Sequence, residues 1–191
     1  MAISEWTTSA WNIRHAVHVL RRGGLIAYPT EAVFGLGCLP DKTQTIKKLL
    51  QLKQRPIEKG LILLAADLSQ LMPYITPLEQ DVEQKIQSDW PGPTTWVVPT
   101  PSRTSPLIRG KFHSIAIRVS AHPIVRELCR QCNSPIISTS ANMTDQNMSY
   151  SAFDVRLRFK NQLDYILNAP LGDSDKPSVI RDAMSERVIR E

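Results

Sequence analysis

Three cationic side chains cluster in one short segment, Lys53-Gln-Arg-Pro-Ile-Glu-Lys-Gly60. Arg55 directly precedes a proline, which holds its backbone extended and restricts the direction of its side chain. Arginine binds carboxylate or phosphate through a planar fork, whereas lysine supplies a mobile point charge. Because Glu58 alone cannot neutralise Lys53, Arg55 and Lys59, the segment predicts a site for an external anion. A solvated charged loop is the alternative interpretation.

A second group of polar side chains, Ser138-Thr-Ser-Ala-Asn142, follows the apolar run 135–137. We interpret it as a polar turn at a strand end, where loops of α/β sheets commonly bind ligands. Hydroxyl and backbone N–H groups of such a turn can surround a phosphate, although they can equally satisfy one another. Thr30 offers a further polar contact after another predicted strand, with a plain turn as the alternative. Arg118 lies inside a predicted strand and therefore needs an anion or an exposed face.

Other common catalytic signatures are absent from the sequence. It contains no phosphate-binding P-loop, no H-E-x-x-H and no G-x-S-x-G, and Gly35-Leu-Gly37 does not continue into a dinucleotide fingerprint. The four histidines lack metal-ligand spacing. Cys129 and Cys132 have a spacing that can bind zinc, but both fall on the apolar face of a predicted helix. We interpret them as core residues, because free cysteine is among the most buried residue types.

The composition is that of a globular α/β protein with a local excess of positive charge. The chain has 191 residues, 42% of them hydrophobic, and a net charge of +5. Residues 42–59 contain six Lys or Arg and one Glu, which accounts for the whole excess. No apolar run reaches the roughly 20 residues of a membrane span, and no secretory signal is visible. With three cysteines, these features predict a cytoplasmic protein.

Helices and strands alternate along the chain, which favours an α/β fold in one domain, residues 1–191. Apolar periodicity predicts helices over 7–22, 41–54, 76–90 and 123–132, and one from Ser151. Strands are predicted at 25–28, 61–64, 94–98, 114–119, 135–137, 164–167, 178–181 and 187–190. Three helix starts carry capping signals: Asp41, Thr76-Pro-Leu-Glu79 and Ser151 with Asp154.

Five motifs then occur in order along the chain. They are Tyr28-Pro-Thr-Glu-Ala-Val-Phe-Gly-Leu-Gly37, Lys53-Gln-Arg-Pro56 with Lys59-Gly60, Trp90-Pro-Gly-Pro-Thr94, Ala116-Ile-Arg-Val119 with His122-Pro123, and Ser138-Thr-Ser-Ala-Asn142. They closely resemble the YrdC/TsaC family, the L-threonylcarbamoyladenylate synthases, over about residues 10–182. The resemblance implies a single-domain YrdC-like fold: a twisted open sheet with flanking helices and a basic concave face.

The resemblance also implies an activity and its partners. Such enzymes form threonylcarbamoyl-AMP from L-threonine, bicarbonate or CO2, and ATP, and they release pyrophosphate. The transferase machinery of TsaD, TsaB and TsaE then places the threonylcarbamoyl group on tRNA. We therefore expect Mg²⁺ with the ATP, no metal site made by protein alone, a weak tRNA contact at most, and no membrane partner.

The recurring K-x-R and S-x-N pairs of the family map onto Lys53, Arg55, Ser140 and Asn142, which we expect to be catalytic. Lys53, Arg55 and Lys59 are expected to bind the triphosphate and the threonine carboxylate. The adenylate phosphate is expected at Ser138, Ser140 and Asn142, and the threonine substrate at Thr30, Arg55 and Arg118.

The sequence departs from the family pattern at one loop and in its length. The family often has glycine two or three residues after Asn142, where this chain has Met143-Thr144-Asp145. The chain also ends near residue 191, as in the short TsaC type.

A non-catalytic module that binds tRNA or ribosomal RNA is the main alternative, because a basic concavity suits RNA as well. Residues 42–59 contain no aromatic side chain on which an unpaired base could stack, which disfavours this alternative. A scaffold protein without chemistry would not need polar loops at three strand ends.

Overall fold

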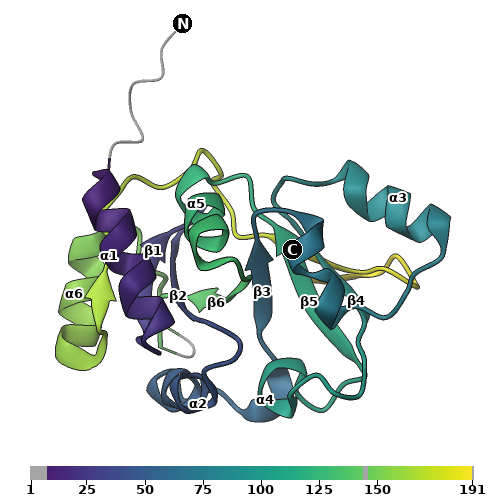
Figure 1. The fold of residues 1–191 in the computed structure, drawn as a ribbon, viewed down its shortest axis with the longest axis horizontal. Helices are drawn as coiled ribbons and strands as arrows, with labels where there is room; N and C mark the ends of the chain where they lie inside the picture. Colours follow the sequence, from purple (N-terminus) through teal and green to yellow (C-terminus); the bar gives the residue numbers. More distant parts are fainter. Residues whose placement is uncertain (1–7, 144–145, 191) are drawn as a thin grey trace, which may run out of the picture.

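A computed structural model describes residues 8–143 and 146–190, which form one α/β domain around a mixed sheet (Figure 1). The strand order is β7-β1-β2-β6-β3-β5-β4-β8-β9. The pairs β1/β7, β3/β5 and β4/β8 are parallel and the other pairs are antiparallel. The strands are β1 (Ile26–Pro29), β2 (Phe34–Cys38), β3 (Ile62–Ala65), β4 (Thr94–Pro99), β5 (Ser114–Val119), β6 (Ile136–Ser140), β7 (Tyr165–Ile166), β8 (Val179–Asp182) and β9 (Val188–Arg190).

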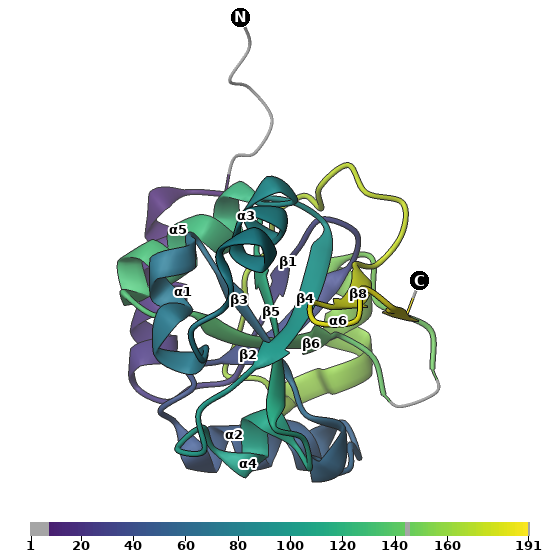
Figure 2. The ribbon, with the colours of Figure 1, turned by 90° about the vertical axis from the view of Figure 1, so that its right-hand side faces the viewer.

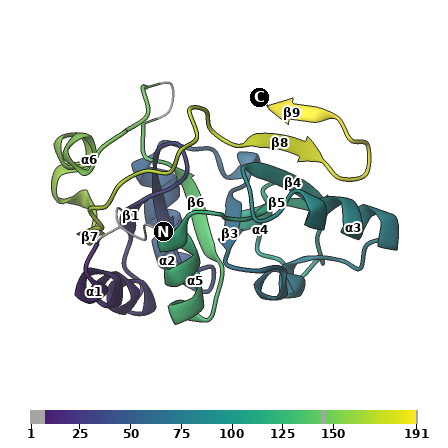
Figure 3. The same cartoon turned by 90° about the horizontal axis from the view of Figure 1, so that it is seen from above.

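Six α-helices and four short 3-10 turns of the described chain flank this sheet. The helices are α1 (Ala10–Arg21), α2 (Thr43–Leu52), α3 (Gln80–Ser88), α4 (Pro106–Arg109), α5 (Pro123–Cys132) and α6 (Ala152–Phe159). The 3-10 turns are η1 (Ile57–Lys59), η2 (Leu68–Gln70), η3 (Met72–Tyr74) and η4 (Lys160–Gln162). Helices α1 and α5 pack side by side, and the C-terminal hairpin of β8 and β9 lies on the side of the molecule away from them (Figure 3).

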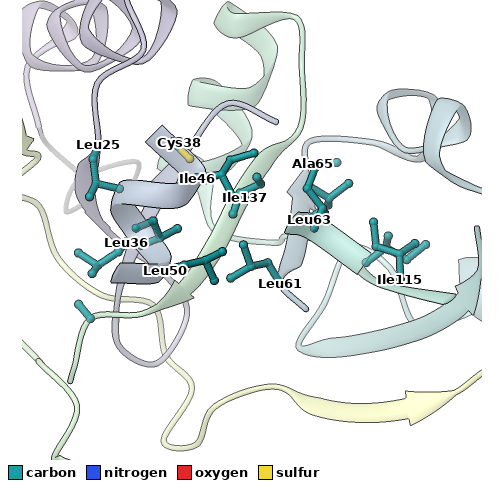
Figure 4. Packing of buried hydrophobic residues seen from close by; sticks show 14 of the residues in the cluster. Leu25, Leu36, Cys38, Ile46, Leu50, Leu61, Leu63, Ala65, Ile115 and Ile137 are labelled. Atoms are coloured by element: carbon teal, nitrogen blue, oxygen red, sulfur yellow. The ribbon is translucent and has the colours of Figure 1, made fainter. Parts of the chain in front are cut away.

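One face of the sheet is packed along most of its length. Leu36, Leu63 and Ile117 point to this face and are fully buried, as are their neighbours on the adjacent strands. Helix α2 supplies Ile46 and Leu50 to the same cluster (Figure 4). Alternate residues of a strand point to opposite faces, so these large side chains leave the residues between them to the other face.

The other face is packed at one end and hollow at the other. Helices α1 and α5 cover Ile26, Leu64 and Ile136. Beyond them, many residues on this face are small, among them Gly35, Ser114, Ala116, Ser138 and Ser140, whereas Ile62 and Val97 are larger. Small side chains on neighbouring strands leave an open volume above the sheet, and β8 and β9 extend the sheet beside it (Figure 2).

The predicted α/β class is confirmed, and most predicted elements match within a few residues. Ser9 caps α1 by accepting from Asn12 N at 3.2 Å, and Ser151 caps α6 by accepting from Asp154 N at 3.0 Å. Residue 7 of the first predicted helix lies outside the described residues, as do Thr144 and Asp145 of the loop that departs from the family pattern.

Two predicted helix caps are wrong. Helix α2 begins at Thr43 with Lys42 at the cap position, and the Asp41 carboxylate pairs with Lys42 Nζ at 2.9 Å instead of capping the helix. Helix α3 begins at Gln80, because the backbone of Thr76 is bonded to β4 (Thr76 N to Pro99 O, 3.0 Å). A tertiary hydrogen bond therefore replaces the local capping box.

Strand β2 was not predicted, and the prediction of a polar turn at Ser138-Thr-Ser140 is wrong. These three residues continue β6, where they pair with Gly37, Leu36 and Gly35 of β2. Glycine and serine have low strand propensity, so the local pattern indicated a turn. The backbone hydrogen bonds between β2 and β6 stabilise the extended conformation of both strands.

The described residues include no helix that is both long and apolar enough to cross a membrane.

Candidate active site

The hollow face of the sheet forms a cavity of about 470 Å³. Gly35, Ala116 and Ser138 form part of its floor, and Ile62 and Val97 add apolar surface. Its walls come from segments far apart in the sequence: 30–34, 59–62, 108–115, 176–180 and 189–190. The chain from β7 to β8 crosses the molecule to reach this wall (Figure 3). The cavity is thus assembled by the fold and not by one loop.

Arginine and lysine side chains line this cavity from several elements. Among the described residues they are Arg55, Lys59, Arg109, Arg118, Lys176 and Arg190, against the two carboxylates Glu31 and Asp182. Burial and then the charge of Arg190 lower the pKa of Arg55, and burial and then Arg118 lower that of Arg190. Mutual repulsion of guanidinium groups around one cavity is relieved when an anion binds between them.

Arg55 is held at the cavity by the loop that follows it. Its Nε and Nη2 donate to the carbonyl oxygen of Gly60 at 3.0 and 2.9 Å. Gly60 has a φ of +62°, and a Cβ there would lie 3.1 Å from the carbonyl oxygens of Ile108 and Arg109. Only glycine adopts this conformation at such close approach without strain. Lys59 is exposed at the rim of the cavity, where its ammonium group can move.

Lys53 lies beneath the cavity and does not line it. The residue is 3% exposed, and its Nζ donates to the carbonyl oxygens of Ser140 and Asn142, both at 2.6 Å. It also donates to Asn142 Oδ1 at 3.1 Å. Burial, followed by the charges of Arg55 and Arg158, lowers the pKa of Lys53 to about 8. In this arrangement the ammonium group holds the end of β6 in place.

The hydroxyl and amide groups of the S-x-N pair are bonded to each other. Ser140 Oγ donates to Asn142 Oδ1 at 2.6 Å, and Asn142 Nδ2 donates to Gln146 O at 2.7 Å. Ser138 and Ser140 line the cavity, whereas Asn142 lies behind it. Thr30 also lines the cavity, and its Oγ1 donates to Val33 O at 2.7 Å. The structure therefore gathers Thr30, Arg55, Ser138 and Ser140 at one cavity, with Lys53 and Asn142 in its support.

Arg118 has the anion that the sequence analysis required. It is 6% exposed, and its Nη2 donates to Glu31 Oε2 at 2.8 Å. Neither Glu31 nor Arg190 was singled out from the sequence. Glu31 lies in the motif that runs from Tyr28 to Gly37, and Arg190 lies in the strand predicted at 187–190. These two features are the signals that could have pointed to them.

Residues 42–59, which hold the excess of positive charge in the sequence, supply only part of the cations that line the cavity. Arg55 and Lys59 come from residues 42–59, but Lys47 and Lys48 lie on the exposed side of α2. Arg109, Arg118, Lys176 and Arg190 come from a region whose charges balance overall. Local concentration in space, and not in sequence, thus determines the charge of the cavity.

The cysteine pair belongs to the core. Cys129 is fully buried, and its thiol donates to Leu64 O at 3.4 Å. Cys132 is half-buried and packs against the same cluster. Burial raises the pKa of both thiols. Among residues 8–143 and 146–190, no three His, Cys, Asp or Glu side chains come together as a metal site would require.

The chain matches the family model Sua5_yciO_yrdC, described as telomere recombination, over residues 18–191. It is 50% identical over 182 residues to a threonylcarbamoyl-AMP synthase of Photobacterium profundum, covering 94% of this chain and 98% of that relative. It is 46% identical over 183 residues to a threonylcarbamoyl-AMP synthase of Hahella chejuensis, covering 96% and 100%.

Two solved structures share the fold. Sua5 of P. abyssi, solved in complex with L-threonine, has a TM-score of 0.88 at 28% identity. That match covers 95% of this chain and 54% of the Sua5 chain, so this chain spans about half of that protein. YciO of E. coli has a TM-score of 0.85 at 26% identity, covering 98% of this chain and 92% of that one.

Proposed function

Because the chain belongs to the Sua5/YciO/YrdC family, we propose that it is a threonylcarbamoyl-AMP synthase acting in tRNA modification. The single observation that carries this function is the near-complete coverage of two synthases at 46% and 50% identity. The basic cavity agrees with it, because the enzyme must hold anionic reactants together. The catalytic reading is thereby favoured over a non-catalytic RNA-binding module.

The reaction joins three small reactants in the cavity. The amine of L-threonine attacks CO2, which is in equilibrium with bicarbonate, and loses a proton to give a carbamate. A carbamate oxygen then attacks the α-phosphorus of ATP, forming a P–O bond as the bond to the β-phosphate oxygen breaks. Threonylcarbamoyl-AMP and pyrophosphate result. The main tasks of the protein are to orient the carbamate and ATP and to neutralise their charge, since both are anions.

The residues around the cavity have the properties that these tasks need. Arg55 and Lys59 present cationic groups for the triphosphate and for the carboxylate of threonine. Ser138 presents a hydroxyl donor to the adenylate phosphate, and Ser140 would donate there after turning its hydroxyl proton away from Asn142 Oδ1, with Thr30 and Arg118 near the threonine substrate. Lys53 and Asn142 fix the strand that carries the two serines.

Mg²⁺ would neutralise charge on the triphosphate. Of the described residues, two carboxylates line the cavity and both are engaged elsewhere, Glu31 with Arg118 and Asp182 with the backbone of Met184 and Ser185. The donor set therefore suits an ion held mainly by phosphate and water oxygens. We further propose that the product passes to a threonylcarbamoyl transferase machinery of the TsaD, TsaB and TsaE type in the cytoplasm.

The test is a direct assay of purified protein. Incubation with ATP, Mg²⁺, L-threonine and bicarbonate is expected to yield pyrophosphate and threonylcarbamoyl-AMP, detected by mass spectrometry. Omission of threonine must abolish both. Arg55→Ala is expected to reduce product formation strongly, whereas Lys48→Ala removes the same charge from the exposed side of α2 and is expected to leave it unchanged. Absence of both products with folded wild-type protein overturns the proposed function.

A further inference from the structure

Glu31 is a buried carboxylate on the cavity wall to which the proposed reaction assigns no role. Its side chain is 9% exposed, and it follows β1 directly after Thr30. A carboxylate at this depth remains ionised only when donors surround it, because removal from water penalises the charged form. Its partners therefore indicate what the charge is for.

Three donors hold the carboxylate, and all come from β5 or the residues that follow it. Arg118 Nη2 donates to Oε2 at 2.8 Å. Ser120 Oγ and Ala121 N donate to Oε1 at 2.7 and 3.1 Å. Burial opposes ionisation of Glu31, but the charge of Arg118 and the hydrogen bond from Ser120 together outweigh it. The pKa of the carboxyl consequently lies below its ordinary value.

This contact determines how Arg118 is presented to the cavity. One terminal nitrogen is used by Glu31, and Arg118 is among the residues that line the cavity. Among the residues that the structure describes, none accepts a hydrogen bond from the buried Arg118 Nε. A buried donor without an acceptor is costly, so the hydrogen bond to Glu31 offsets only part of the cost of burying this guanidinium.

We propose that Glu31 is a positioning residue, which fixes the guanidinium of Arg118 so that its remaining N–H groups meet an anionic oxygen of a substrate. The proposal rests on the proposed function, and it applies to either oxyanion in that reaction, a phosphate of ATP or the carboxylate of threonine. A guanidinium fixed before the ligand arrives loses little side-chain freedom on binding. Glu31 also balances the charge of Arg118, which limits its repulsion of Arg190.

The backbone of the same residue has a separate, structural role. Glu31 O accepts from Ser174 N at 3.1 Å, and Thr30 O accepts from Gly172 N at 3.0 Å. These bonds tie the segment leading to β8 against the turn after β1. Because they involve only main-chain atoms, a side-chain substitution at Glu31 leaves them in place. The role of the carboxylate can therefore be measured by itself.

The experiment is a double-mutant cycle of Glu31→Gln and Arg118→Gln, read out by calorimetric binding of ATP and of L-threonine in separate titrations. Glutamine keeps the size of the side chain but loses the charge, and it offers one acceptor oxygen where the carboxylate offers two to Arg118, Ser120 and Ala121. We expect Glu31→Gln to weaken binding of one titrant about tenfold, and that titrant identifies the oxyanion. In the Arg118→Gln background the same change is expected to have no further effect.

Two comparisons separate positioning from general stability. Glu31→Asp retains the charge on a shorter side chain and is expected to restore part of the affinity. Glu127→Gln removes a carboxylate on α5, where it accepts from Gln131, and is expected to leave binding unchanged. Thermal melts of all variants report stability independently. If Glu31→Gln does not fold, Glu31→Asp replaces it in the cycle, with a coupling of the same sign and smaller size.

The proposal is overturned if folded Glu31→Gln binds both titrants as the wild type does. It is also overturned if the losses of affinity in the double variant are additive, or if the wild type binds neither titrant. Coupled losses support it. The proposed function fails separately: a wild type that binds and shows the coupling but forms no threonylcarbamoyl-AMP refutes the reaction and not the role of Glu31.

Discussion

Lys53 Nζ donates to the carbonyl oxygen of Asn142 at 2.6 Å, across 89 positions of sequence. The same nitrogen donates to Ser140 O and to Asn142 Oδ1, so one ammonium group satisfies three oxygens at the end of β6. The K-x-R and S-x-N pairs are thus joined physically. Lys53 fixes the strand whose serines line the cavity, while Arg55, two residues later, lines the cavity itself.

Replacement of Lys53 by methionine tests this support. Lys53→Met removes this donor from the carbonyl oxygens of Ser140 and Asn142 and leaves Asn142 Oδ1 with the Ser140 hydroxyl, and we expect the free energy of unfolding to fall by about 3 kcal/mol. Chemical denaturation measures the loss. Lys47→Met on the exposed side of the same helix is the matched control and is expected to change stability by less than about 0.5 kcal/mol. Equal stability of the two variants would contradict the supporting role.

The pH dependence of stability gives a second test of Lys53. Its pKa is about 8 in the folded protein and 10.5 in the ordinary case. Between these values the unfolded chain binds more protons at this residue than the folded chain does, so stability rises with pH. We expect the difference in unfolding free energy between wild type and Lys53→Met to grow in favour of wild type from pH 8 toward 10.5. A difference that does not vary with pH would refute this.

Arg190 lets the C-terminal strand contribute to the cavity. Its Nη2 donates to Ser178 O at 3.0 Å, which fixes the β8–β9 hairpin beside the cavity. After burial, the charge of Arg190 is the next cause that lowers the pKa of Arg55. Arg190→Gln removes the charge and is expected to weaken ATP binding about tenfold at low salt. The difference from wild type should shrink as salt screens the charges. Arg187→Gln, in the exposed turn before β9, is the control, and equal affinities of the two variants would count against a role for Arg190.

Gly37 and Gly35 point to the same face of the sheet, but only Gly35 of these two lines the cavity, and the space around them differs. A Cβ at Gly37 would approach Ile137 O to 2.4 Å and Tyr28 Cε1 to 2.8 Å, whereas at Gly35 no atom would be nearer than 3.2 Å. We expect Gly37→Ala to destabilise the protein by about 1–3 kcal/mol, because β2 and β6 must move apart. Gly35→Ala should cost less, and thermal melts of the two variants give the comparison. A more stable Gly37→Ala would show that the strands adapt freely.

The sequence by itself determined the α/β class, most helices and strands, and the family motifs. These features depend on local periodicity, on caps such as Ser9 and Ser151, and on residue types at short spacing. It also singled out Arg55, Ser138 and Ser140, which the structure places at one cavity, because their motifs are short and continuous. Where a tertiary contact competes with a local signal, as at Thr76 or in the Ser138–Ser140 strand, the local prediction failed.

Only the tertiary structure decided which partner each charged group has. Lys53 reaches Asn142, and Arg118 reaches Glu31 across 87 positions, because the strand order brings their elements together. Arg190 joins the cavity because β8 pairs with β4 and β9 with β8. Composition counts charges along the chain, but Coulomb interactions depend on distance and burial in space. In the part of the chain that the structure describes, six cationic side chains from several elements line the cavity, and residues 42–59 supply two of them.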